Sequence, residues 1–160
     1  MNTWSIHELA IFSVRDLTFG VDASQIREIV TTKNLELLRE LDDTCPFFLI
    51  RHRQQPLPLF LLVTQFRMPG SPLPLSVPLT FVTFLREGIL MACVIDRIEG
   101  FVSVSLTSLK LVPKIMMRSA QKGCVWGFYE MADTLIPLID FEHIVTDQEL
   151  TFYKTMLSAM

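Results

Sequence analysis

The sequence is poor in the residues from which catalytic and metal sites are usually built. It contains three cysteines, three histidines and six glycines among 160 residues. The cysteines stand far apart without a Cys-x-x-Cys pair, which argues against a zinc site or a disulfide framework. The glycines are not grouped, so there is no phosphate-binding loop and no nucleophile elbow. These absences favour a protein that is not an enzyme and holds no cofactor or metal.

Charge is scarce as well, and positive charge is not in excess. The chain has 14 Lys and Arg residues against 17 Asp and Glu residues, for a net charge of −3. Nucleic-acid binding needs a positive surface. The one local basic group, Arg51-His52-Arg53, is too small to supply it. We therefore expect no nucleic-acid partner.

Long apolar segments are absent although hydrophobic residues make up 50% of the chain. The most apolar runs, Leu57 to Val63 and Leu73 to Leu85, are shorter than the roughly 20 residues of a membrane-spanning helix. The first residues lack the basic start and apolar core of an export signal. We expect one cytoplasmic domain over residues 1–160, without membrane insertion. A cytoplasmic location predicts that the three cysteines are reduced, and we expect them to be mostly buried: Cys45, Cys93 and Cys124.

Short stretches rich in β-branched and aromatic residues predict strands joined by tight turns. The predicted hairpins are Leu9 to Val14 with Leu17 to Asp22, Leu79 to Leu85 with Ile89 to Ile95, and Val125 to Met131 with Thr134 to Ile139; further strands are Phe47 to Ile50, Leu57 to Val63 and Ile98 to Val104. Gly20 indicates a bulge or a close backbone approach inside its strand. Pro56 and Pro58 indicate that their strand lies at an edge or has a bulged start, because proline lacks a ladder donor.

Two helices are predicted from apolar spacing and capping residues. The first helix begins after Asp22, and its apolar residues recur at helical spacing: Ala23, Ile26, Ile29 and Val30. Gln25 occupies the position of a capping-box partner for Asp22. The side chains expected to face outward are Ser24, Gln25, Arg27 and Glu28. The second runs over about 146–158 and begins with the capping box Thr146-Asp147-Gln148-Glu149. Residues 31–44 are predicted as loop with a possible helical turn, and 68–78 as loop. Together these elements predict an all-β barrel or sandwich with peripheral helices.

Few residues are candidates for chemistry. His143 follows Asp140 and Glu142, but His7, His52 and His143 have no partner at metal-ligand spacing, and the charges near His143 fit a solvated strand-to-helix border. A thiol nucleophile at Cys93 or Cys124 is conceivable. The apolar strand around Cys93 should nevertheless raise its thiol pKa and leave it inert. Asp96 is the sharpest acidic candidate, although a strand-end Asp usually accepts hydrogen bonds from nearby backbone N–H groups.

A high content of apolar residues in a protein made mainly of strands is compatible with three functional hypotheses. The first is an interaction module that binds partners through grooves or sheet edges. The second is a small-ligand sensor that uses a barrel mouth, and the third is a cysteine-dependent enzyme. A well-packed monomer with a large core would have a similar composition.

Several segments resemble the CheW-like domain family, in the same order and over nearly the whole chain. The matching segments are Phe12 to Asp22 followed by Ile26-Arg27-Glu28-Ile29, Arg53 to Leu62, Ala92 to Ile98, Leu111-Val112-Pro113, Gly127, and Leu135 to Asp140. The first resembles the family's aromatic-Gly-aliphatic-Asp block and the helix that follows it. The resemblance implies two small intertwined five-stranded β-barrels that share one hydrophobic core.

The resemblance also implies a function and the residues that carry it. Members of the family are non-catalytic adaptors that couple chemoreceptors to a CheA-type histidine kinase in bacterial chemosensory arrays. The expected partners are the kinase regulatory domain, the cytoplasmic tips of methyl-accepting chemoreceptors, and other CheW-like adaptors. The partner-binding residues implied by the match are Ile26, Arg27, Glu28 and Arg53, and the expected location is the cytoplasm at membrane-associated receptor arrays.

The chain departs from the family pattern around Arg53. Gln54 replaces the usual glycine, Leu61 replaces an aspartate, Arg51 replaces an asparagine, and Ala92 replaces a glycine. Glutamine adopts a positive φ less readily than glycine does, so the loop at Arg53 is expected to change. These departures indicate a divergent member, and an alternative role in a non-flagellar pathway such as surface motility or gene control.

Overall fold

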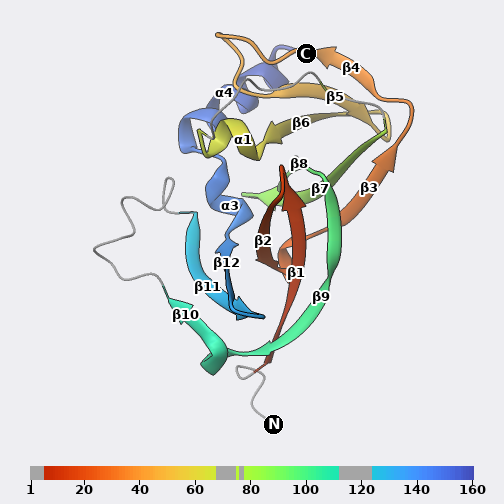
Figure 1. Ribbon diagram of the computed structural model, residues 1–160. Helices are drawn as coiled ribbons and strands as arrows, with labels where there is room; N and C mark the ends of the chain where they lie inside the picture. The colour runs from red at the N-terminus through yellow and green to blue at the C-terminus, as the bar shows by residue number, and fades with distance from the viewer. Residues whose placement is uncertain (1–5, 68–74, 76–77, 112–123) are drawn as a thin grey trace.

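Two curved sheets form most of the described structure, a computed structural model that covers residues 6–67, 75, 78–111 and 124–160 (Figure 1). The first sheet comprises β1 (Ile6–Val14), β2 (Leu17–Asp22), β9 (Arg97–Ser105), β10 (Leu109–Leu111), β11 (Val125–Met131) and β12 (Thr134–Ile139). The second comprises β3 (Glu28–Thr32), β4 (Glu36–Arg39), β5 (Phe48–His52), β6 (Gln55–Leu61), β7 (Leu79–Arg86) and β8 (Ile89–Ile95). The helical elements are η2 (Ala23–Gln25), α1 (Leu62–Gln65), η3 (Leu106–Ser108), α3 (Phe141–Ile144) and α4 (Asp147–Ser158).

The strand order is β10-β11-β12-β2-β1-β9 in the first sheet and β3-β7-β8-β6-β5-β4 in the second. Figure 1 shows the first sheet in the lower half of the molecule and the second in the upper half, with α4 beside the second. The all-β class with peripheral helices is confirmed. Each sheet has six strands within the described residues, and not five, because the short edge strands β10 and β4 are included.

Four hairpins turn through two residues that both have positive φ. The residue pairs and their φ angles are Arg15 (49°) and Asp16 (67°), Arg53 (52°) and Gln54 (64°), Glu87 (50°) and Gly88 (77°), and Ala132 (49°) and Asp133 (64°). Turns of this kind match the right-handed twist of the flanking strands. The three predicted hairpins are confirmed. The fourth joins β5 to β6, so two strands predicted separately form another hairpin.

The first predicted helix is wrong beyond its first turn. Only η2 is helical, and Asp22 caps it by accepting a hydrogen bond from the Ser24 N–H at 3.0 Å. The chain then enters β3, whose residues pair with β7 from Glu28↔Thr83 to Thr32↔Leu79. The β-branched residues of Glu-Ile-Val-Thr-Thr suit a strand better than a helix. Gln25 does not complete a capping box, and its amide instead donates to Asp140 at 2.8 Å.

Two further predictions about the second sheet need correction. Residues 31–44 contain the short strand β4, which pairs with β5, where loop and a helical turn were predicted. Strand β6 lies inside the sheet between β8 and β5, not at an edge. Its parallel pairing with β8 begins only at Leu59, after Pro56 and Pro58. The prolines therefore occupy the part of β6 that has a partner on one side only. The predicted loop over 68–78 lies mostly outside the described residues.

Gly20 marks a close approach, as the sequence indicates. It lies opposite Ile11 on β1 and opposite Leu138 on β12, where the two strands run parallel. A Cβ atom at this position would lie 2.7 Å from Cδ2 of Leu138. A hydrogen in place of a side chain therefore lets β12 pair with β2.

The high apolar content is explained by strands that are buried on both faces. In β1, Leu9 and Ile11 belong to a small cluster on one face of the first sheet, whereas Ala10 and Phe12 belong to the main core. The second sheet repeats the arrangement, with its own small cluster on one face. The main core joins side chains from both sheets, α3 and α4. Two sheets thus share one hydrophobic core, as the resemblance implies.

The C-terminal helix is confirmed and docks against the second sheet. Its capping box is formed by Thr146 and Glu149, and Leu150 and Tyr153 are buried. The Tyr153 hydroxyl donates to the carbonyl oxygen of Pro56 at 3.2 Å. The ring of Phe47 meets that of Tyr153 edge-on, with centroids 5.6 Å apart. The helix therefore covers part of the main core.

Candidate functional site

Glu28 and Arg53, two of the residues that the sequence implicates, form an ion pair. Glu28 begins β3, and Arg53 occupies the turn between β5 and β6. The Arg53 guanidinium donates to one carboxylate oxygen of Glu28. The other carboxylate oxygen lies 3.1 Å from Nε2 of His52. Glu28 is thus held by Arg53 in the hairpin turn and by His52 at the end of β5.

The curvature of the second sheet brings these residues together. In the strand order, β7, β8 and β6 separate β3 from β5, so a flat sheet would keep Glu28 and Arg53 apart. His52 also contacts β7, because its ring lies edge-on to that of Phe81 with centroids 5.6 Å apart. The turn of the β5–β6 hairpin therefore reaches over the sheet to its first edge strand.

The departure of Gln54 from glycine does not remove the turn. Arg53 and Gln54 both keep positive φ, which is the backbone that a two-residue hairpin needs. Gln54 thus adopts the positive φ that glycine adopts more readily. The pairing of β5 with β6 on both sides of the turn holds the two residues in this conformation.

The three side chains of this cluster differ in their exposure to solvent. The Arg53 side chain is 73% exposed, that of Glu28 29% and that of His52 16%. An exposed ion pair contributes about 0.2–1 kcal/mol to stability, because water screens both charges and two side chains must be ordered. Arg53 is therefore available to a partner at little cost to the fold.

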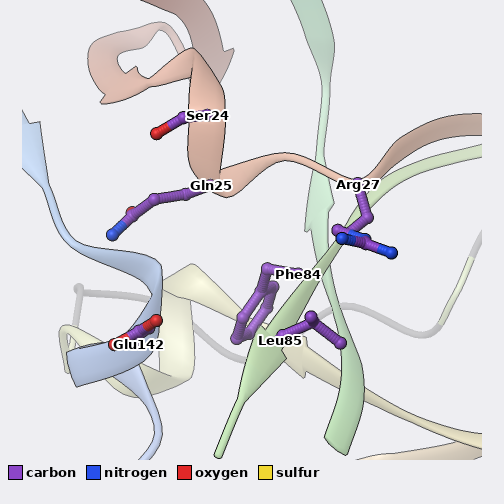
Figure 2. A pocket seen from close by; sticks show the side chains of 6 residues that line it. All are labelled: Ser24, Gln25, Arg27, Phe84, Leu85 and Glu142. Atoms are coloured by element: carbon purple, nitrogen blue, oxygen red, sulfur yellow. The ribbon is translucent and has the colours of Figure 1, made fainter. Parts of the chain in front are cut away.

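Ile26 and Arg27 lie between η2 and β3 and differ in orientation. Ile26 is half-buried and packs against the main core. Arg27 is exposed, and its backbone N–H donates to the carbonyl oxygen of Thr83 at 2.7 Å. Its side chain borders a pocket next to Phe84 (Figure 2). Of the four residues implicated by sequence, the structure thus joins Glu28 and Arg53 directly, whereas Ile26 faces mainly inward.

His52 and Ile29 belong to this region although sequence reasoning did not select them. The sequence indicates His52 only as a candidate metal ligand and as part of the basic group Arg51-His52-Arg53. Ile29 was assigned to the buried face of a helix, but it is 42% exposed on the edge strand β3. The strand period of residues 28–32 is the signal that would have shown Ile29 and Glu28 on opposite sides of the backbone.

The remaining chemical candidates have structural roles. Asp96 accepts a hydrogen bond from the Arg15 N–H at 2.7 Å, as a strand-end Asp is expected to do. His143 lies 2.6 Å from Asp140, which caps α3 through the Glu142 N–H. Burial raises the pKa of the Cys93 thiol well above its ordinary value, which confirms the expected shift. In residues 6–67, 75, 78–111 and 124–160, no three or more His, Cys, Asp or Glu side chains gather as metal ligands would.

Comparison with known proteins identifies the family. A family model described as CheW-like domain matches residues 8–149. The chain belongs to the CheW-like domain family. The CheW-like fold is also seen in a crystal structure of the scaffolding protein TtCheW from Thermoanaerobacter tengcongensis, with a TM-score of 0.72 and 15% sequence identity. The superposition covers 89% of this chain and 94% of TtCheW. A search of curated proteins finds no significant match.

The CheW-like segments identified from sequence fall at defined places in the fold. The first block forms the β1–β2 hairpin, Arg53 to Leu62 forms β6 and its turn, and Leu135 to Asp140 forms β12. Val112 and Pro113 lie outside the described residues. No helix in the described part of this CheW-like chain is long and apolar enough to span a membrane.

Proposed function

We propose that this CheW-like domain is a non-catalytic adaptor that couples methyl-accepting chemoreceptors to a CheA-type histidine kinase. Its binding targets are the cytoplasmic tip of the receptor and the regulatory domain of the kinase, with other CheW-like adaptors as further partners. The proposal places the protein in the cytoplasm, recruited to membrane-associated receptor arrays. The observation that carries it is the ion pair of Glu28 with Arg53, in a chain that belongs to the CheW-like family.

The proposed docking surface consists of Arg27, Glu28, Arg53 and the exposed part of the half-buried Ile26, with Ile29 and His52 beside them. It combines the exposed charge of Arg53 and the partly exposed charge of Glu28 with Ile29, which is exposed on the opposite side of the same edge strand. At protein interfaces, buried apolar contacts supply most of the affinity, and charges set specificity and association rate. Because β3 is an edge strand, a partner that covers this edge can contact Ile29 on one side for the first task and Glu28 with Arg53 on the other side for the second.

Size-exclusion chromatography tests the proposal with purified partners from the same bacterium. We expect the chain to co-elute with the kinase regulatory domain and with a soluble receptor fragment. Arg53→Ala and Glu28→Ala are expected to weaken at least one of these complexes. The matched controls are Arg51→Ala and Glu36→Ala, because these residues form a similar exposed ion pair between β4 and β5 at 3.2 Å. Equal losses in both pairs of variants would contradict the assignment of the docking surface.

A further inference from the structure

A pocket of about 310 Å³ lies where the two sheets meet; neither Glu28 nor Arg53 lines it, although it shares Arg27 with the proposed docking surface. It is lined by Ser24, Gln25, Arg27, Phe84, Leu85 and Glu142 (Figure 2). These residues come from three distant parts of the chain: η2 with the segment after it, strand β7, and helix α3. The volume is at the lower end of the range for small-molecule sites.

Hydrogen bonds hold the walls of the pocket in place. The side-chain amide of Gln25 donates to Asp140 at 2.8 Å, and its carbonyl oxygen accepts from the Phe141 N–H at 3.0 Å. These two bonds fasten η2 to the start of α3. On the other side, the Arg27 N–H donates to the Thr83 carbonyl oxygen at 2.7 Å. The pocket is therefore formed before any ligand arrives, which lowers the cost of binding.

The floor of the pocket is apolar and firmly packed. Phe84 is 1% exposed and stacks on Phe141, with centroids 5.2 Å apart and an angle of 24° between the ring planes. Figure 2 shows Phe84 and Leu85 between Arg27 on one side and Glu142 on the other. A ligand above this floor thus has a cation at one end and an anion at the other.

The two charged side chains of the pocket are not used by the fold. Within the described residues, the Arg27 guanidinium and the Glu142 carboxylate have no ion-pair or hydrogen-bond partner. A larger hollow of about 530 Å³ beside α4 offers a contrast. There, Asp42 accepts hydrogen bonds from Thr44 and Cys45, and Glu149 completes the capping box of α4. Two of the three acidic side chains of that hollow, Asp42 and Glu149, are therefore engaged by the fold, whereas the single acidic side chain of the smaller pocket, Glu142, is available.

We propose that the pocket binds a small zwitterion of the size of a dipeptide. The ligand carboxylate pairs with Arg27, its ammonium group pairs with Glu142, and its aliphatic part lies against the partly exposed Leu85, above the buried Phe84. Opposite charges at the two ends of an apolar floor select one orientation and reject ligands that carry a single charge. This ligand class fits the pocket better than a simple anion or cation, because either would leave one wall unmatched.

Titration with the dipeptide alanylleucine, followed by chemical shifts of the backbone amides, tests the proposal. We expect saturable changes near residues 24–27, 84–85 and 142. Arg27→Gln and Glu142→Gln should each weaken binding roughly tenfold, the value of one charge-assisted hydrogen bond in a partly exposed site. Arg97→Gln is the matched control, because Arg97 is an exposed arginine outside the pocket.

Modified ligands assign each contact to one end of the dipeptide. N-acetyl-alanylleucine lacks the ammonium group and should bind the wild type and Glu142→Gln equally weakly. Alanylleucine amide lacks the carboxylate and should bind the wild type and Arg27→Gln equally weakly. Unsaturable shifts with the wild-type protein would overturn the proposal, and so would unchanged affinity in both folded variants. Because Glu142 is not part of the docking surface, loss of dipeptide binding in Glu142→Gln with intact partner binding separates the two proposals.

Discussion

Removing Glu28 should cost more stability than removing Arg53, although the two residues form one ion pair. Arg53→Ala deletes only the contact of a 73% exposed side chain, so we expect a loss below about 1 kcal/mol in the free energy of unfolding. Glu28→Ala deletes the same contact and also the hydrogen bond to the more buried His52. A net hydrogen bond adds about 0.5–1.5 kcal/mol. The expected total for Glu28→Ala is therefore about 0.7–2.5 kcal/mol.

Urea unfolding of the wild type, both single variants and the double variant measures these differences and the coupling between the residues. We expect a coupling energy of about 0.2–1 kcal/mol. The Arg51 and Glu36 pair, with side chains 44% and 60% exposed, gives the reference cycle for an ion pair without a histidine. If Arg53→Ala proves as costly as Glu28→Ala, or the coupling exceeds about 2 kcal/mol, the pair is a structural element, and its assignment to partner docking loses its basis.

Substitutions at three further positions test the fold. Ile26→Lys should lower stability by about 1–3 kcal/mol, seen as a lower melting temperature, because the half-buried side chain packs on the main core; an unchanged melting curve would contradict that placement. Gly20→Val should lower the free energy of unfolding in urea by about 1–3 kcal/mol, and Gly20→Ala by less. The reason is that a Cβ atom at position 20 would lie 2.7 Å from Cδ2 of Leu138, which must move. Equal stability of both variants and the wild type would refute the close approach. Burial raises the pKa of Tyr153 from 10.0 to about 12. The neutral hydroxyl therefore contributes fully to the free energy of unfolding below pH 10, and this contribution is lost between about pH 10 and 12, where the tyrosine ionises first in the unfolded chain. The free energy of unfolding of Tyr153→Phe, measured against pH, should lack this decline.

Local signals in the sequence predicted the hairpins and the C-terminal helix. The turn pairs Arg15-Asp16 and Ala132-Asp133 stand between strands of matching period, and the capping box at Thr146 is complete within four residues. Each of these elements depends on neighbours in the chain. The resemblance to the CheW-like family supplied the two-sheet architecture with a shared core, which no local pattern could establish.

Long-range contacts caused the errors. Apolar residues at Ile26, Ile29 and Val30 satisfy a helical period, but pairing with β7 makes residues 28–32 a strand. Strand β6 is interior because its second half meets β8, more than 30 positions along the chain. The pairing of Glu28 with Arg53 likewise depends on the curvature of the second sheet. A sequence pattern cannot contain that information, because it does not specify how far a sheet bends.

Kinase autophosphorylation in a reconstituted array tests the adaptor role most directly. The assay compares phosphate incorporation by the CheA-type kinase with receptor-containing membranes, with this protein, and with both together. We predict that the rate changes substantially only when all three components are present, and that Arg53→Ala reduces the effect while Arg51→Ala preserves it. An identical rate with and without the folded protein, at concentrations well above those of receptor and kinase, would contradict the claim that it couples the two.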